Sequence, residues 1–157
     1  MLLNTIKKDL KIAMKAKDTL KISTLRMITS SIKNMEISNR SSFNEDSPND
    51  SLSDSEIIQL LSKMIKQRKE SAEIYSKSSR NDLEKKENDE IEIIKRYMPS
   101  QIDDEKVNEL IDQVINETGS SNIRDMGKVM SVLKEKYSGQ MDFGKTSSIV
   151  KEKLNSQ

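Results

Sequence analysis

The break at Pro99 constrains the fold of this chain more than any other feature. Its ring prevents a helix from continuing and pushes the preceding residue toward an extended conformation. Apolar residues at helical spacing run directly into this proline, namely Ile91, Ile94, Tyr97 and Met98. Just beyond it, Asp103 can accept hydrogen bonds from the free N–H groups of a new helix. The sequence therefore predicts two helical domains, residues 1–99 and residues 100–157.

The composition predicts that both domains are all-α. Only 33% of the residues are hydrophobic and 3% are aromatic, with no Trp and two Phe, so the core must be thin. Small helical bundles fold with such cores, and four Gly and two Pro supply too few turns for a many-stranded fold. We expect an N-terminal bundle of about four helices and a C-terminal three-helix bundle.

The first domain begins with two closely spaced helices. The first should end near Lys17 and bury one apolar stripe: Leu3, Ile6, Leu10, Ala13 and Met14. The second follows so soon that the pair should form an antiparallel hairpin. Residues 38–53 are rich in Ser, Asn and Asp and poor in apolar residues, which predicts a mobile loop. Ser53 and Glu56 then form a capping-box pattern that opens a long third helix.

The second domain is divided by caps and glycines. Gly119 stands where a fifth helix would end in a left-handed cap. Asn122, with Asp125 three residues on, opens a sixth helix, and Gly139 ends it. Asp142 caps a seventh. Three short helices predict a small bundle of about 55 residues, which is marginal by surface-to-volume scaling.

Charge is spread unevenly along the chain. Residues 1–40 hold nine Lys/Arg against three Asp/Glu (+6), residues 41–99 ten against thirteen (−3), and residues 100–157 eight against ten (−2). Residues 118–157 alone hold seven against four (+3). If a polyanion binds, the first two and the last two helices are the candidate surfaces, with four lysines foremost: Lys7, Lys8, Lys11 and Lys15. The alternative is a charged face that only contacts water.

The residue types present exclude several kinds of chemistry. Without Cys there is no disulfide or thiolate nucleophile, and without His the usual general base and imidazole metal ligand are missing. No phosphate-binding loop, dinucleotide fingerprint or metalloprotease motif occurs. We therefore predict no catalytic residue, no metal and no cofactor. No signal peptide or apolar run of about 20 residues is found, so we expect a cytoplasmic protein that binds no membrane.

Five strings occur in one order along essentially the whole chain. They are L-R-M-I-T-S-S-I-K (25–33), L-S-K-M-I-K-Q-R-K-E-S-A-E-I-Y (61–75), E-I-E-I-I-K-R-Y-M-P-S-Q-I (90–102), R-D-M-G-K-V-M (124–130) and S-G-Q-M-D-F-G-K (138–145). Together they resemble the GatB/YqeY family. The resemblance implies a stand-alone, two-domain helical protein.

The second half is similar to the tail of the B subunit of the tRNA-dependent amidotransferase, which converts Glu-tRNA(Gln) or Asp-tRNA(Asn) to the amidated forms. In that enzyme other domains and subunits hold the catalytic centres, and the tail helps to hold tRNA. The resemblance thus implies a non-catalytic module that engages tRNA or a component of an amidotransferase or synthetase. The residues it marks as candidates are Asp125, Gly127, Lys128, Gly139, Asp142 and Lys145.

Three of the marked residues also have a structural interpretation. Gly127 could let a phosphate approach a helix N-terminus, or could let two helices pack closely. Asp125 and Asp142 could form a carboxylate pair for Mg²⁺ or acid/base work, or could only cap helices. Family members often have Lys-Ala where this chain has Gln140 and Met141, which removes a possible phosphate contact.

Two other functions remain open at this stage. One is a protein-binding adaptor that touches no nucleic acid. The other is an accessory to a carbon–nitrogen ligase that uses glutamine as amido-N-donor, as the family name suggests. The basic cluster at Lys66 to Lys69 does not decide between them, because Lys66 with Glu70 and Lys69 with Glu73 form i, i+4 pairs typical of a solvated face.

Overall fold

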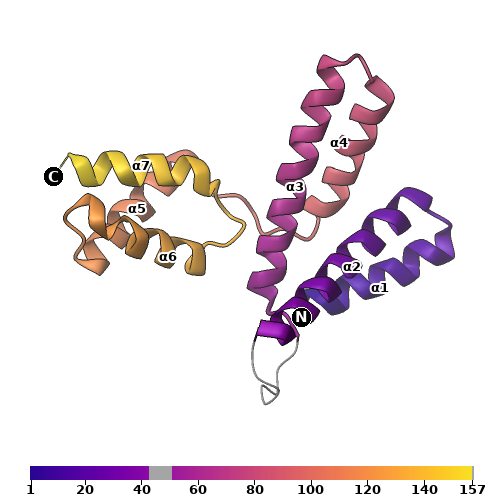
Figure 1. Cartoon of the computed structure of the whole chain (residues 1–157), viewed down its shortest axis with the longest axis horizontal. Coiled ribbons are helices and arrows are strands. Elements are labelled where there is room, and N and C mark those ends of the chain that lie inside the picture. The colour runs from indigo at the N-terminus through magenta and orange to yellow at the C-terminus, as the bar shows by residue number, and fades with distance from the viewer. Residues whose placement is uncertain (43–50, 157) are drawn as a thin grey trace. The chain divides into compact units, whose positions relative to one another are not determined.

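The computed structural model describes residues 1–42 and 51–156, apart from the side chains of residues 40–42. All regular elements in these residues are helices, which confirms the predicted all-α class (Figure 1). The chain divides into two compact units, Met1–Met98 and Pro99–Gln157. Among the described residues, no helix combines the length and the apolar character that a membrane span requires.

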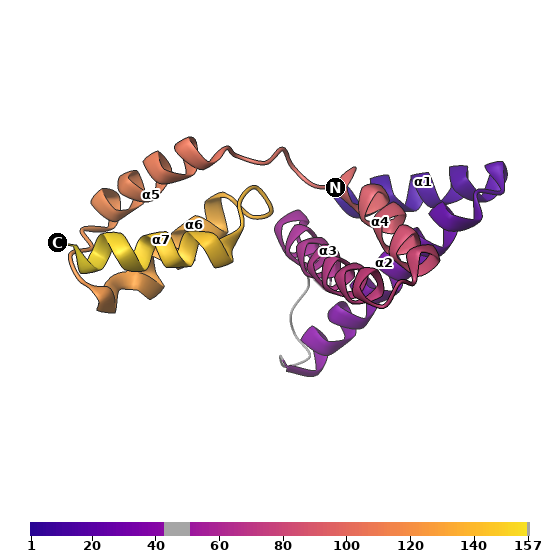
Figure 2. The same ribbon diagram turned by 90° about the horizontal axis from the view of Figure 1, so that it is seen from above.

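The N-terminal unit consists of two helical hairpins. Helix α1 (Leu2–Ala16) pairs with α2 (Thr19–Ser42), and α3 (Asp54–Lys77) pairs with α4 (Asn81–Lys95). Both views of the ribbon show the two helices of each pair side by side (Figures 1 and 2). The predicted antiparallel hairpin of the first two helices is therefore confirmed.

Two residues make the turn between α1 and α2. Lys17 has a φ of 56°, the left-handed conformation that ends a helix, and its N–H donates to the carbonyl of Met14. The Asp18 N–H donates to the carbonyl of Ala13 at 3.1 Å. The Asp18 carboxylate then accepts the N–H of Lys21 at 3.0 Å, so it stabilises the start of the next helix.

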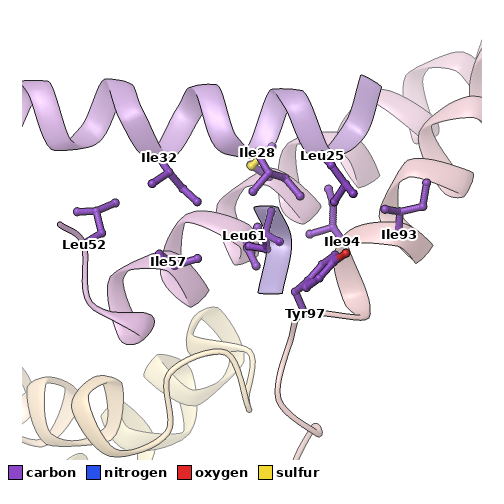
Figure 3. Close-up of a cluster of buried hydrophobic side chains, with 11 residues drawn as sticks. Leu25, Ile28, Ile32, Leu52, Ile57, Leu61, Ile93, Ile94 and Tyr97 are labelled. Carbon is purple, nitrogen blue, oxygen red and sulfur yellow. The ribbon is translucent and has the colours of Figure 1, made fainter. Parts of the chain in front are cut away.

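The core of this unit lies where the two hairpins meet. Figure 3 shows side chains from α2, α3 and the end of α4 converging with Leu52, and the cluster comprises Ile6, Leu25, Ile28, Ile32, Leu52, Ile57, Leu61, Met64, Ile93, Ile94 and Tyr97. The predicted apolar stripe of α1 is correct except for Met14, which is 48% exposed. Met14 lies at the edge of the stripe, next to the lysines.

The predicted mobile loop over residues 38–53 is wrong at its start, whereas its last residues, 51–53, are non-helical as predicted but include a buried side chain. Helix α2 continues through residues 38–42, where neither Pro nor Gly interrupts it. At the other end Leu52 is buried in the core, and its N–H donates to the carboxylate of Glu36 at 3.4 Å. One apolar side chain was therefore enough to fix the backbone next to α3. The centre of the predicted loop, residues 43–50, lies outside the described residues.

The C-terminal unit packs three helices around a separate core. They are α5 (Asp104–Thr118), α6 (Met126–Lys136) and α7 (Phe143–Asn155), with a short 3-10 turn η1 (Ile123–Asp125) before α6. Their buried side chains form one cluster: Val107, Leu110, Ile111, Val114, Ile115, Val129, Met130, Leu133, Met141, Val150 and Leu154. The predicted sixth helix is correct, except that its first turn is the 3-10 turn.

Candidate nucleic-acid interface

Four lysines form one continuous exposed face on α1. We call this surface the α1 lysine face, and it consists of Lys7, Lys8, Lys11 and Lys15. All four side chains are exposed. On a helix of 3.6 residues per turn they fall within an arc of about 100°. Two exposed apolar side chains, Ile12 and Met14, border this arc. The opposite side of the helix carries Ile6 and Ala13, which are buried. Packing of the apolar stripe therefore turns the lysines toward solvent.

No carboxylate in the described part of the chain pairs directly with this face. Among the described residues, none of its four lysines forms an ion pair. The three carboxylates of residues 1–40 have other hydrogen-bond donors: Asp9 accepts from the Tyr97 hydroxyl, Asp18 from the Lys21 N–H and Glu36 from the Leu52 N–H. The face can therefore attract a polyanion without first breaking an ion pair.

Tyr97 keeps the carboxylate of Asp9 bound on the inner side of α1. Its hydroxyl donates to Asp9 Oδ2 at 2.7 Å, and its ring is buried. Burial raises the pKa of the Tyr97 phenol well above its ordinary value of 10.0, and the hydrogen bond to Asp9 raises it further. The phenol therefore remains a donor throughout the physiological pH range.

In the C-terminal unit, Asp125 and Lys128 have structural partners. The Asp125 carboxylate accepts the N–H groups of Ser121 and Asn122 at 3.0 and 3.4 Å, as the predicted capping pattern requires. Lys128 Nζ donates to the carbonyl of Thr118 at 2.8 Å, where it satisfies an oxygen at the end of α5. The capping interpretation of Asp125 is therefore confirmed, and the exposed ammonium group of Lys128 uses one of its three donors within the unit.

Gly127 is exposed at the start of α6. A Cβ added to it would meet no atom within 4 Å among the described residues. Close helix packing therefore does not explain this glycine inside the C-terminal unit. The backbone of α6 remains open to an external group at this position.

In the turn before α7, two of the three marked residues accept hydrogen bonds within the C-terminal unit. Gly139 is buried at a φ of 73°, and its carbonyl accepts from Gln101 Nε2 at 2.6 Å. The Asp142 carboxylate accepts the N–H groups of Gly144 and Lys145 at 2.9 and 3.4 Å, which confirms it as the cap of α7. The Lys145 side chain is exposed. Of this group, Lys145 is the residue that presents a positive charge to solvent.

The ten candidate residues, which are the four lysines of α1 and the six marked by the family resemblance, thus fall into two separate sets. The α1 lysine face belongs to the N-terminal unit, and the other six residues belong to the C-terminal unit. Within the second set, Gly127 and Lys145 offer accessible groups, whereas the remaining residues shape turns and helix ends. Across the described residues, no cluster of three or more potential metal-ligating side chains is found.

Sequence reasoning missed a buried ion pair in the basic cluster of α3. Arg68 is 7% exposed, and its Nε donates to Glu90 Oε2 of α4 at 2.9 Å. Its other nitrogens donate to the Met64 carbonyl at 3.2 Å and to the Met27 sulfur at 2.6 Å. Spacing could have revealed that Arg68 is buried, because it follows Met64 by four residues on the inward stripe, but it could not have revealed the partner on α4.

The solvated pairs predicted for this cluster differ from those observed. Glu73 pairs with Lys77 at 2.8 Å instead of with Lys69. The hydrogen bond from Lys77 lowers the pKa of the Glu73 carboxyl. Both side chains are largely exposed, so the pair adds little stability.

Comparison with known proteins gives one family and a set of curated relatives. The family model described as Yqey-like protein matches residues 3–154. Relatives called "Altered inheritance of mitochondria protein 41, mitochondrial" are 45% identical over 93 residues in Lachancea thermotolerans, 35% over 127 in Vanderwaltozyma polyspora and 37% over 118 in Clavispora lusitaniae. These matches cover 59%, 77% and 74% of this chain but 46%, 64% and 64% of the relatives. The chain therefore spans about half to two thirds of their length.

Proposed function

Because this chain belongs to the Yqey-like protein family, we propose that it is a non-catalytic helical module that binds tRNA. The observation that carries the proposal is the α1 lysine face, which is exposed, continuous and free of ion pairs among the described residues. Nucleic-acid affinity arises largely from lysine and arginine side chains that neutralise phosphates. Such a face requires no catalytic group in order to hold tRNA.

The C-terminal unit supplies a second candidate contact. Lys145 projects its charge into solvent after the Asp142 cap, and the backbone at Gly127 is uncovered. An anion near the start of α6 would benefit from the helix dipole, although the N–H groups of Asp125 and Met126 already donate to the carbonyls of Asn122 and Ile123. Lys128, Asp125, Gly139 and Asp142 would support this surface by fixing the turns around it, in keeping with the resemblance to the amidotransferase tail.

A titration of purified chain into labelled bulk tRNA tests the proposal. Binding should be strong at low salt and should weaken steeply as salt rises, because each neutralised phosphate releases counterions. If tRNA does not bind even at 50 mM salt, the proposal is wrong. Recovery of a protein partner at all salt concentrations, without RNA, would instead favour the adaptor. Amidation of a substrate only when the chain is added to a ligase would favour the accessory function.

The cellular compartment belongs to the same proposal. The relatives carry the word mitochondrial in their names, and that word describes those proteins. For this chain, cytoplasmic location stays a prediction. Immunodetection of the native protein in separated cell fractions would test it, and recovery with an organelle fraction would contradict it.

A further inference from the structure

We propose that the α1 lysine face binds the phosphate backbone of a double-stranded RNA stem and does so independently of base sequence. The inference rests on the proposed tRNA binding and specifies which part of the RNA is held and by which surface. It assigns the primary contact to the N-terminal unit, and not to the C-terminal motifs that the family resemblance marks.

The arrangement of the charges supports a regular backbone as the ligand. Lys7, Lys11 and Lys15 follow one another at one-turn intervals, about 6 Å apart along the helix axis, and Lys8 lies beside them. Because α1 is held by its buried side against the core, this row has a fixed direction. A row of lysines about 12 Å long on a fixed helix backbone can reach successive phosphates of an ordered strand.

The side chains on this face offer little for reading bases. Helix α1 contains no aromatic residue and no Arg, so it can neither stack on unpaired bases nor form the planar bidentate contacts that Arg makes. Asn4 is the one amide on the same arc. Lysine ammonium groups act as point charges toward phosphate. Sequence-specific single-strand recognition is therefore disfavoured.

Double-stranded RNA matches what the face can do. Its deep, narrow major groove hides the bases from side chains, so proteins recognise such stems mainly by shape and by contacts to phosphates and 2′-hydroxyls. A tRNA presents several such stems. The α1 lysine face would hold any of them through the backbone.

The C-terminal candidates are less able to provide the main attraction. Lys128 is bonded to the Thr118 carbonyl, and the Asp142 carboxylate occupies the N–H groups at the start of α7. Lys136 and Lys153 are paired with Glu117 and Asp112 at 2.9 and 2.7 Å. The α1 lysine face gathers four lysines, unpaired among the described residues, on one arc of one helix, whereas the other exposed cations of the C-terminal unit that form no ion pair there are spread over η1, α6 and α7: Arg124, Lys134, Lys145 and Lys151.

Fluorescence anisotropy with the full chain tests the inference. The probes are two RNA duplexes of about 16 bp with unrelated sequences, one strand of each alone, and bulk tRNA. The central variant replaces Lys7, Lys8, Lys11 and Lys15 with Gln. The matched control replaces the same four residues with Arg, and two further variants are N4A and K145Q.

We expect the wild type to bind both duplexes equally and to bind the single strands more weakly. The Gln variant should lose duplex and tRNA binding together, and its plot of log affinity against log salt should be flatter by about three to four. The Arg variant should retain binding because its charge is unchanged, and N4A should match the wild type. Circular dichroism checks that all variants keep their helix content.

The outcomes separate this inference from the proposed function. If tRNA binds and the Gln variant binds as tightly as the wild type, the tRNA proposal stands and the α1 assignment is overturned. A clear preference between the duplexes, or tighter binding of single strands, would overturn the stem-backbone inference alone. If the duplexes bind and tRNA does not, the proposed function fails while the α1 surface stands. Absence of all RNA binding refutes both.

Discussion

At the scale of single residues, the Arg68–Glu90 pair matters most for stability. Both side chains are more than nine-tenths buried, and Arg68 also contacts the Met27 sulfur of α2, so this one guanidinium links the two hairpins. Burying two charges is costly, and the cost is offset only while both partners are present. Loss of either partner leaves an uncompensated charge in the interior.

We therefore expect E90A to lower the free energy of unfolding by about 3 kcal/mol or more. The matched control is E92A on the same helix, because Glu92 pairs with Lys95 at the surface and its loss should cost less than about 1 kcal/mol. Urea unfolding followed by circular dichroism measures both. Equal losses of unfolding free energy for the two substitutions would show that the buried pair contributes no more to stability than the surface pair.

Tyr97 gives the N-terminal unit a dependence on alkaline pH. Its pKa is raised in the folded state, so the stability it contributes is fully present below the ordinary value of 10.0 and is lost as pH rises through the folded-state pKa. Because Phe cannot ionise, Y97F should lack this component. Melting temperatures of the two proteins should differ by a constant amount up to about pH 9 and converge above pH 10. Parallel curves over the whole range would contradict this assignment.

A substitution at Gly127 can show whether this glycine is needed for the fold or for ligand binding. Gly in a helix costs up to about 1 kcal/mol relative to Ala, and open space surrounds this position, so G127A should stabilise the chain by up to about that amount. G119A is the matched control and should destabilise, because Gly119 has a φ of 62° that strains other residues. Thermal melts give the signs. If G127A stabilises the chain but weakens tRNA binding, the glycine serves the ligand.

At the scale of elements, helix ends were predictable because their signals are local. The capping box of Ser53 and Glu56, the cap at Asp103 and the left-handed Gly119 each depend on residues within three or four positions. Arg68 and Glu90 lie 22 residues apart on two helices, so their pairing emerges only when α3 and α4 pack. The same holds for the site, where the sequence singled out the four lysines but could not show that Tyr97 donates to Asp9, 88 residues away.

Two lysines of the C-terminal unit, Lys128 and Lys145, have different surroundings in the structure although the sequence does not distinguish them. Lys128 donates to the end of α5, whereas Lys145 extends into solvent at the start of α7. K128Q should therefore lower stability slightly, by less than about 1 kcal/mol, because the bond is exposed. K145Q should leave the melt unchanged and reduce tRNA affinity modestly, with a salt plot flatter by about one. The reverse pattern would exchange the roles assigned to the two residues.

At the scale of the whole molecule, two cores that share no residue should lose protection separately. Leu61 is fully buried in the first cluster and Leu133 in the second. Truncating a buried Leu to Ala costs about 2–5 kcal/mol through lost contacts and a cavity, and that cost falls on the cluster that contains it. We expect L61A to accelerate amide hydrogen exchange in α1 to α4, and L133A to accelerate it in α5 to α7.

This separation bears directly on the proposed function. If each unit keeps its own stability, L133A can loosen the C-terminal unit while the α1 lysine face stays ordered and retains its affinity for an RNA stem. L61A should instead weaken stem binding, because α1 is held by the core that the substitution damages. Hydrogen exchange by mass spectrometry and stem binding, measured on the same samples, would test both steps. Loss of protection throughout the chain with either substitution would mean that the units unfold as one, and the α1 face could then not act independently.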